Sequence, residues 1–184
     1  MICIKPPSLR ISRLPPPRTS PGRRSLRSRL WGAGVALAVG CASLLLMPSG
    51  PAHAQAVPQP RLSTIELSAG MHNIVAEVAR TPQQQQIGMM MRTKMEQHEG
   101  MLFVFDDVAP RCFWMRNTLL PLSIAFVADD GTIVNIAEMQ PQSDESHCAL
   151  RPVRYALEMN KGWFAKRGIK PGTKLRGSPF SAAR

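Results

Sequence analysis

The residues best suited to chemistry lie in one short stretch, CFWMRNTLLPLSIAF, residues 112–126. If this stretch is a strand, alternate side chains point to opposite faces. Phe113 and Met115 would then face the core, while Trp114, Arg116 and Thr118 would share the second face. A guanidinium beside an indole can stack on the ring, and it can hold a carboxylate with two hydrogen bonds. The pattern therefore favours either an ion pair or a binding site around the arginine.

These two interpretations lead to different partners for Arg116. In the structural one, Arg116 pairs with Glu158 on a neighbouring strand and Asn117 forms the bend before Pro121, because arginines in half-buried strands are usually paired. The alternation in 154–159 puts Glu158 on the non-core face of that strand, opposite Tyr155 and Leu157. In the functional one, a pocket over Trp114 grips an anionic or polar ligand, since binding sites combine an apolar floor with a few polar groups. The ligand-binding candidates are then Arg92, Trp114, Arg116, Asn117, Thr118 and Glu158.

The N-terminus has the three parts of an export signal. A basic segment precedes the uncharged run LWGAGVALAVGCASLLLM, residues 30–47, and an A-x-A cleavage site ends at Ala54. We expect residues 1–54 to be a signal peptide that is removed after Ala54, which places the protein in the periplasm. A twin-arginine route at Arg23-Arg24, a lipoprotein signal at Cys41 and an uncleaved anchor remain alternatives.

Charge is distributed unevenly along the chain. The formal net charge is +11, but residues 1–54 hold 8 of the 23 basic residues and none of the 12 acidic ones. The remainder therefore has 15 basic and 12 acidic residues, a net charge of +3. Nucleic-acid-binding proteins usually have a clustered basic face, so we expect no nucleic-acid partner. Contact with the membrane is expected only through the signal sequence during export.

Cleavage would leave Cys112 and Cys148 as the only cysteines, because Cys3 and Cys41 precede Ala54. An even number of cysteines in an oxidising compartment favours a disulfide. The pattern therefore predicts a Cys112–Cys148 bond, with free thiols or a metal site as alternatives.

The evidence for a metal or an enzyme is weaker. The soft ligands lack the spacing of a metal motif, and methionine stripes are more often core, so we expect no cofactor or metal. They are Met89, Met90, Met91, Met95, Met101, Met115, Cys112, His147 and Cys148. Possible acids and bases are present without a nucleophile-elbow, metalloprotease or phosphate-loop motif. They are His98, His147, Asp106, Asp107, Glu99 and Glu158.

The elements that would position these residues are short. Alternating or apolar runs separated by turn residues predict a mainly β fold, a compact antiparallel sandwich or barrel with two short helices. Strands are expected over 63–67, 73–79, 100–105, 112–116, 122–128, 132–138, 154–159 and 173–176, and helices over 82–91 and 161–167. We divide the chain into a disordered leader (55–61), a single domain (62–177) and a disordered tail (178–184), and we expect a monomer.

Several segments in a fixed order carry a family resemblance. IGMMMR (87–92), GMLFVF (100–105), FWMRNTLLPLSIAFV (113–127), DDGTIVNI (129–136), YALEMNKGW (155–163) and GIKPG (168–172) resemble the bacterial domain of unknown function 192. The resemblance implies a compact mainly-β fold and an often exported protein, and it implies no established reaction. The family pattern commonly has aspartate where this chain has Ser123.

These observations lead to one functional hypothesis and two alternatives. The leading hypothesis is a periplasmic single-domain module that binds a small molecule, an envelope component or a protein partner without chemistry. One alternative is a periplasmic hydrolase or transferase that uses an acid or histidine near Trp114 and Arg116. The other is a soft-metal protein that binds copper.

Overall fold

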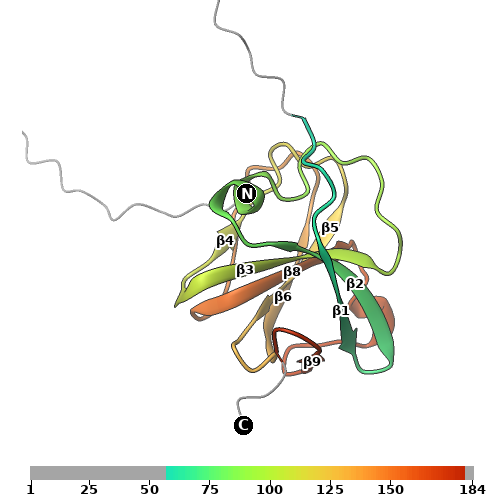
Figure 1. Ribbon diagram of the computed structural model, residues 1–184, viewed down its shortest axis with the longest axis vertical. Helices are drawn as coiled ribbons and strands as arrows, with labels where there is room; N and C mark the ends of the chain where they lie inside the picture. The colour runs from blue at the N-terminus through green and yellow to red at the C-terminus, as the bar shows by residue number, and fades with distance from the viewer. Residues whose placement is uncertain (1–56, 181–184) are drawn as a thin grey trace, which may run out of the picture. The chain divides into compact units, whose positions relative to one another are not determined.

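The computed structural model describes residues 57–180 (Figure 1). The predicted signal peptide and its cleavage site after Ala54 lie outside the described residues. Within them, no helix has the length and apolar character of a membrane-spanning segment.

Two helices and nine strands make up the described domain. The helices are α1 (Pro82–Ile87) and the 3-10 helix η1 (Ala165–Arg167). The strands are β1 (Thr64–Ala69), β2 (His72–Ala79), β3 (Glu99–Ala109), β4 (Cys112–Phe113), β5 (Leu122–Val127), β6 (Ile133–Met139), β7 (His147–Cys148), β8 (Val153–Asn160) and β9 (Leu175–Arg176).

Seven of these strands form one curled sheet in the order β6-β5-β8-β3-β2-β1-β9, and β4 pairs with β7 in a small second sheet. All neighbours in the large sheet are antiparallel except β2 and β3, which run parallel. The strands cross Figure 1 at different angles as the sheet curls. The prediction of a compact mainly-β domain with two short helices is confirmed.

The curled sheet closes over a short stretch, where residues 131–133 meet residues 172–175. Thr132, just before β6, forms an isolated antiparallel bridge with Lys174, just before β9. Leu175 N donates to Gly131 O at 2.8 Å. A Cβ on Gly131, whose φ is 85°, would lie 2.6 Å from Leu175 O, so only glycine allows this approach. Beyond the bridge, β6 is the edge of the sheet, and a seam separates it from the segment before β9.

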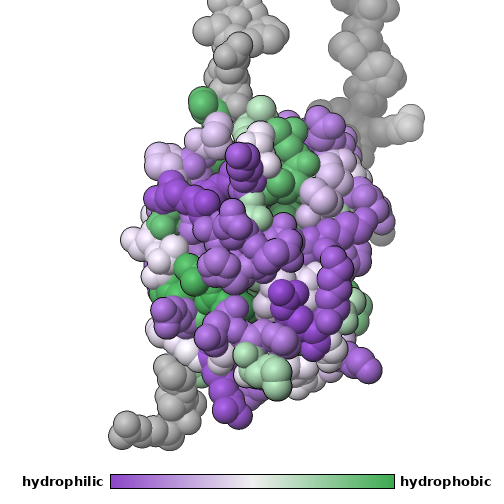
Figure 2. Space-filling view, turned by 90° about the vertical axis from the view of Figure 1, so that its right-hand side faces the viewer, coloured by the Kyte–Doolittle hydropathy of each residue, from purple (hydrophilic) through white to green (hydrophobic). Residues whose placement is uncertain are grey.

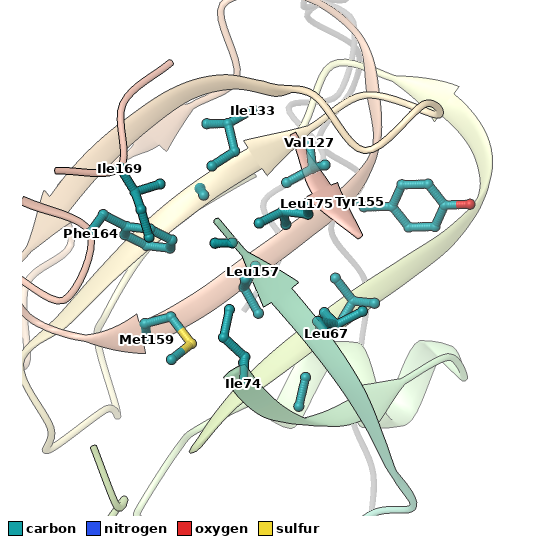
Figure 3. Packing of buried hydrophobic residues seen from close by; sticks show 14 of the residues in the cluster. Leu67, Ile74, Val127, Ile133, Tyr155, Leu157, Met159, Phe164, Ile169 and Leu175 are labelled. Carbon is teal, nitrogen blue, oxygen red and sulfur yellow. The ribbon is translucent and has the colours of Figure 1, made fainter. Parts of the chain in front are cut away.

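The inner face of the curl holds one hydrophobic core, to which each of the seven strands contributes. Trp163, Phe164 and Ile169 from the segment after β8 complete it. In Figure 3, Phe164 and Ile169 lie together at one end of this core and Tyr155 lies at the other. The end near Phe164 borders the seam.

A second core covers the opposite face of the central strands. Met101, Phe103, Ile124 and Phe126 from the sheet pack there with buried residues from the connecting segments, which are Met89, Phe113 and Met115. The face of β8 that holds Ala156 and Glu158 was predicted to be non-core. That prediction was wrong, because the connecting segments 88–98 and 112–121 cover it.

Several element boundaries differ from the predicted ones. Strand β3 continues through Asp106 and Asp107, which were expected to end it, since both side chains point to solvent at its far end. Helix α1 is capped at its start by Thr81, with reciprocal hydrogen bonds between Thr81 and Gln84. It ends at Ile87 rather than at residue 91.

The ordered domain also extends beyond its predicted limits. Gln59, in the expected leader, is buried and donates to Gly88 O at 2.8 Å. Phe180, in the expected tail, is buried edge-on against Tyr155. The first segment therefore packs against the end of α1, and the second packs against β8.

Candidate functional site

Trp114 and Arg116 lie together, although not on a strand. Strand β4 ends at Phe113, and the following residues turn. Met115 is buried while Arg116 is exposed, so the methionine side faces inward as predicted. The Arg116 guanidinium stacks 4.0 Å from the Trp114 ring centroid, and its Nε donates to Asp144 Oδ1 at 2.7 Å. The predicted ion pair with Glu158 was wrong, since Asp144 is the carboxylate that Arg116 binds.

Glu158 instead lies in the second core. Its register partners Met101 and Ile124 are both buried there, and Met101 also pairs with Glu77 on the next strand. Among the described residues, Glu158 Oε2 accepts no hydrogen bond. Burial raises the pKa of this carboxyl to about 7. Glu158 is thus an unpaired acid beneath the connecting segments.

Arg92 pairs with Glu77 rather than facing a ligand pocket over Trp114. Its Nη2 donates to Glu77 Oε2 at 2.8 Å, and its Nη1 donates to the other oxygen. The backbone of Leu62 and the side chain of Arg61 also donate to this carboxylate. Burial acts to raise the pKa of Glu77, but the hydrogen bonds from Arg92 and Leu62 outweigh it and hold the pKa below its usual value.

Asn117 and Thr118 link the connecting segments. Asn117 O accepts from Met91 N at 2.9 Å, and Thr118 is buried with its carbonyl accepting from Gln142 N. Of the six candidates, Glu158 therefore lies on the sheet itself, and the other five belong to the connecting segments that cover its second face. Arg92 alone among them borders one of the three clefts described for residues 57–180.

The predicted disulfide is present. Cys112 and Cys148 pair across β4 and β7, with an S–S distance of 2.05 Å and a separation of 36 positions in sequence. The bond ties the polar loop 139–152 to the stretch that contains Trp114. Among the described residues, no group of three or more His, Cys, Asp or Glu side chains could hold a metal ion.

The cleft beside Arg92 is open and carries several charges. It has a volume of about 250 Å³ and is lined by Gln59, Arg61, Met91, Arg92 and Lys94, among others. Glu77 already engages Arg92 and Arg61, and Glu99 binds Arg61 as well. The charges of this cleft are therefore largely neutralised within the domain.

A more apolar cleft lies in the seam of the curled sheet, and we call it the seam slot. Ile136 and Glu138 of β6 form one wall. The segment from Phe164 to Pro171 forms the other, with Phe164, Ile169 and Pro171 as its larger apolar side chains. The slot has a volume of about 320 Å³. It exists because β6 and this segment diverge beyond the backbone contacts that Thr132 and Ile133 make with residues 172–174.

Glu138 is held in place at the slot. Ser123, directly across from it on β5, donates its hydroxyl to Glu138 Oε1 at 2.7 Å. The backbone N–H of Gly162 donates to Glu138 Oε2 at 3.1 Å and to Ser123 Oγ at 2.7 Å. The resemblance expects a carboxylate at position 123. Here serine stands there, and the carboxylate comes from the neighbouring strand.

None of the slot residues was among the predicted site residues. A partial signal was present, since Ile136 and Glu138 alternate on one face of the predicted strand 132–138. Ile169 is also an apolar residue just before the turn-forming residues Pro171 and Gly172. The closure of the sheet brings these slot residues together, and sequence patterns do not reveal that closure.

Figure 2 shows a face of the molecule that is mostly hydrophilic, with small hydrophobic areas between polar side chains. On the described domain, four large apolar side chains are exposed, and they are Val57, Met71, Val108 and Leu150. None of the four lines the seam slot, so the slot is an apolar site separate from these scattered side chains.

The fold and the slot define a small curled-sheet domain with an apolar cleft at its open seam. The chain belongs to the family of domain of unknown function 192, described as an uncharacterised ACR, which matches residues 64–177.

Two solved structures are similar over most of their own length. One, from Sinorhizobium meliloti 1021 and named as a candidate transcription regulator, is 35% identical with a TM-score of 0.61, covering 65% of this chain and 98% of its own. The other is a protein of unknown function from Novosphingobium aromaticivorans DSM 12444. It is 36% identical with a TM-score of 0.58, and the match covers 62% of this chain and 84% of its own. No curated protein matches the chain.

Proposed function

We propose that the protein is exported to the periplasm, loses residues 1–54, and there binds a small molecule in the seam slot without catalysing a reaction. One observation carries the binding part of the proposal. The slot has about 320 Å³ of space between Ile136, Phe164, Ile169 and Pro171, with Glu138 and Lys170 as polar groups. Ligand sites are typically clefts of about 300–1,000 Å³ with mostly apolar walls and few polar groups, and barrel mouths are a frequent place for them.

The groups at the slot support binding rather than catalysis. Ser123 is fully buried and donates its hydroxyl to Glu138, so a substrate in the slot does not meet its oxygen. Glu138 accepts hydrogen bonds from Ser123 and from Gly162 N. A nucleophile placed beside a base, as covalent catalysis requires, is not found among the residues that line the slot.

Nucleic acid is not part of the proposal, although one similar structure is named as a candidate transcription regulator. Residues 55–184 carry 15 basic and 12 acidic residues. Several of these charges pair with each other, as Arg61 and Arg92 do with Glu77. Phosphate backbones are bound by clustered, available cations.

The disulfide supports export. Both cysteines of residues 55–184 are joined in one bond, and such bonds persist mainly in oxidising compartments. Intact mass of the protein from a periplasmic extract, before and after reduction and alkylation, tests this. We expect the mass of residues 55–184 and two thiols that react only after reduction. The full-length mass in the cytoplasmic fraction alone would contradict it.

Binding can be tested with isoamyl alcohol, a small neutral apolar probe, by methyl NMR of the purified protein. We expect saturable shifts of the Ile136 and Ile169 methyl groups. Ala165 lines the slot from exposed η1, so Ala165→Phe should fill the slot and abolish these shifts. Val108→Phe, which adds an aromatic ring at an exposed position outside the slot, should leave them unchanged. Equal loss of these shifts in both variants would refute the proposal.

A second candidate function rests on Glu158. Its pKa of about 7 is in the range that suits a general acid or base at neutral pH. Chromogenic ester, phosphate and glycoside substrates can be tested with wild type and with Glu158→Gln. Turnover that disappears in the variant, while the variant stays folded, would favour a hydrolase. If none of the three substrates is turned over, binding remains as the single proposed function.

A further inference from the structure

The seam slot has opposite charges on its two walls. Glu138 projects from β6, and Lys170 belongs to the segment on the other side. Both residues are exposed, and no ion pair joins them among the described residues. Ile136, Phe164 and Ile169 line the slot, and Phe164 and Ile169 are themselves buried in the core. The slot therefore offers one acid, one base and an apolar patch to a single occupant.

Hydrogen bonds hold both Glu138 and Lys170 in place at the slot. The Glu138 carboxylate accepts from Ser123 Oγ and Gly162 N, which leaves lone pairs on both oxygens for a ligand. Lys170 sits in a closed turn, where Thr173 N donates to Lys170 O at 3.0 Å. Gly172 N anchors this turn to β6 by donating to Ile133 O at 2.8 Å.

The charge pattern decides among ligand classes. A ligand with only a carboxylate would match Lys170 and bring its negative charge toward Glu138. A ligand with only an ammonium would match Glu138 and approach Lys170 with the same sign. A ligand with both charges matches both walls, since complementary potentials favour the correct partner and suppress others.

We infer that the seam slot takes a zwitterion with an apolar side chain, such as an apolar α-amino acid. Its ammonium faces Glu138, its carboxylate faces Lys170, and its side chain contacts Ile136, Phe164 and Ile169. This inference rests on the proposed function, because it names the class of ligand for the same slot.

Four probes with nearly the same branched side chain separate the contributions of the charges. They are L-leucine, isocaproate (no ammonium), isoamylamine (no carboxylate) and isoamyl alcohol (neither), each titrated into the purified protein by methyl NMR. Exposed ion pairs contribute modestly, so we expect L-leucine to bind about fivefold more tightly than either singly charged probe.

Two charge variants assign each contribution. Glu138→Gln keeps an oxygen that can accept from Gly162 N and should remove the advantage of L-leucine over isocaproate. Lys170→Gln should remove its advantage over isoamylamine. Each variant should leave the other advantage intact.

Failure of the zwitterion inference and failure of the proposed function give different results in this experiment. Equal binding of all four probes in the slot would overturn the zwitterion inference and leave the proposed function standing. Tightest binding of isocaproate or of isoamylamine would also overturn it, in favour of a singly charged ligand. Binding of none of the four would refute the proposed function itself.

Discussion

The buried carboxyl of Glu158 gives the domain a specific dependence on pH. Burial raises its pKa from 4.5 to about 7. Below the lower value, the carboxyl is protonated in both the folded and the unfolded chain. Between the two values, the unfolded chain releases the proton while the folded chain keeps it, so the free energy of unfolding falls as pH rises. Above the higher pKa, the loss of unfolding free energy is complete.

The size of this effect follows from the two pKa values. They differ by about 2.5, and each unit corresponds to about 1.4 kcal/mol, so the full loss is on the order of 3 kcal/mol. Domains of this size are stable by only about 5–15 kcal/mol. An unpaired acid in the second core therefore costs a large share of the folding free energy at neutral pH.

Urea unfolding of wild type and Glu158→Gln tests this at about pH 5 and about pH 8. Glutamine has a similar size and does not titrate. The stability of the variant relative to wild type should therefore rise by roughly 2.5 kcal/mol between the two pH values. The same relative stability at both would show that the carboxyl is solvated or paired in the folded protein, and it would refute the reasoning.

Two controls accompany this measurement. Glu77 has a lowered pKa in the folded protein. Its contribution to the free energy of unfolding is therefore present above the pKa of the unfolded chain, and it is lost as pH falls toward the folded pKa. Glu77→Gln should therefore destabilise the domain to a similar extent at about pH 5 and about pH 8. Arg116 binds Asp144 rather than Glu158, so Arg116→Ala and Glu158→Gln should have additive effects.

Three further predictions concern stability. Reducing the Cys112–Cys148 bond, or replacing both cysteines with serine, should lower the free energy of unfolding by about 3–4 kcal/mol, because the bond closes a loop of 36 residues; an unchanged urea midpoint would contradict this. Arg92→Ala should cost about 3–5 kcal/mol in chemical denaturation, since it leaves Glu77 buried without its main partner, and a loss under about 1 kcal/mol would mean that solvent reaches the carboxylate. Gly131→Ala should lower the thermal midpoint and speed amide exchange at the bridge before β9, because its Cβ would meet Leu175 O at 2.6 Å; unaltered exchange there would argue against the described closure.

Much of the fold could be predicted because local patterns decide it. The run GMLFVF is apolar on both alternating faces, and β3 has Leu102 in the inner core and Met101 and Phe103 in the second. The turn Asp129-Asp130-Gly131 joins β5 and β6 between the predicted strands 122–128 and 132–138, with Asp130 accepting from Thr132 N. The disulfide followed from the number of cysteines and the expected compartment.

The partner of Arg116 could not be predicted in the same way. The alternation in β8 placed Glu158 on the face opposite Tyr155 and Leu157, and that was correct. The pattern did not reveal that irregular segments cover this face. Such segments have no periodicity, so the burial of Glu158 and the pairing of Arg116 with Asp144 both depend on how these segments fold over the sheet.

The seam slot was missed for a related reason. Its walls come from β6 and from the segment after β8, and they meet only because the sheet curls until Thr132 reaches Lys174. Neither wall has an unusual sequence. A site formed by the closure of a sheet becomes visible only when strand order and curvature are known.

The most direct test of the central claim is the detection of intermolecular nuclear Overhauser effects between L-leucine and the purified protein. The account predicts contacts from the leucine methyl groups to the methyl groups of Ile136 and Ile169 and to the Phe164 ring. These contacts should disappear in Ala165→Phe. Contacts only to other methyl groups, such as those of Leu150, would contradict the claim that the seam slot is the binding site.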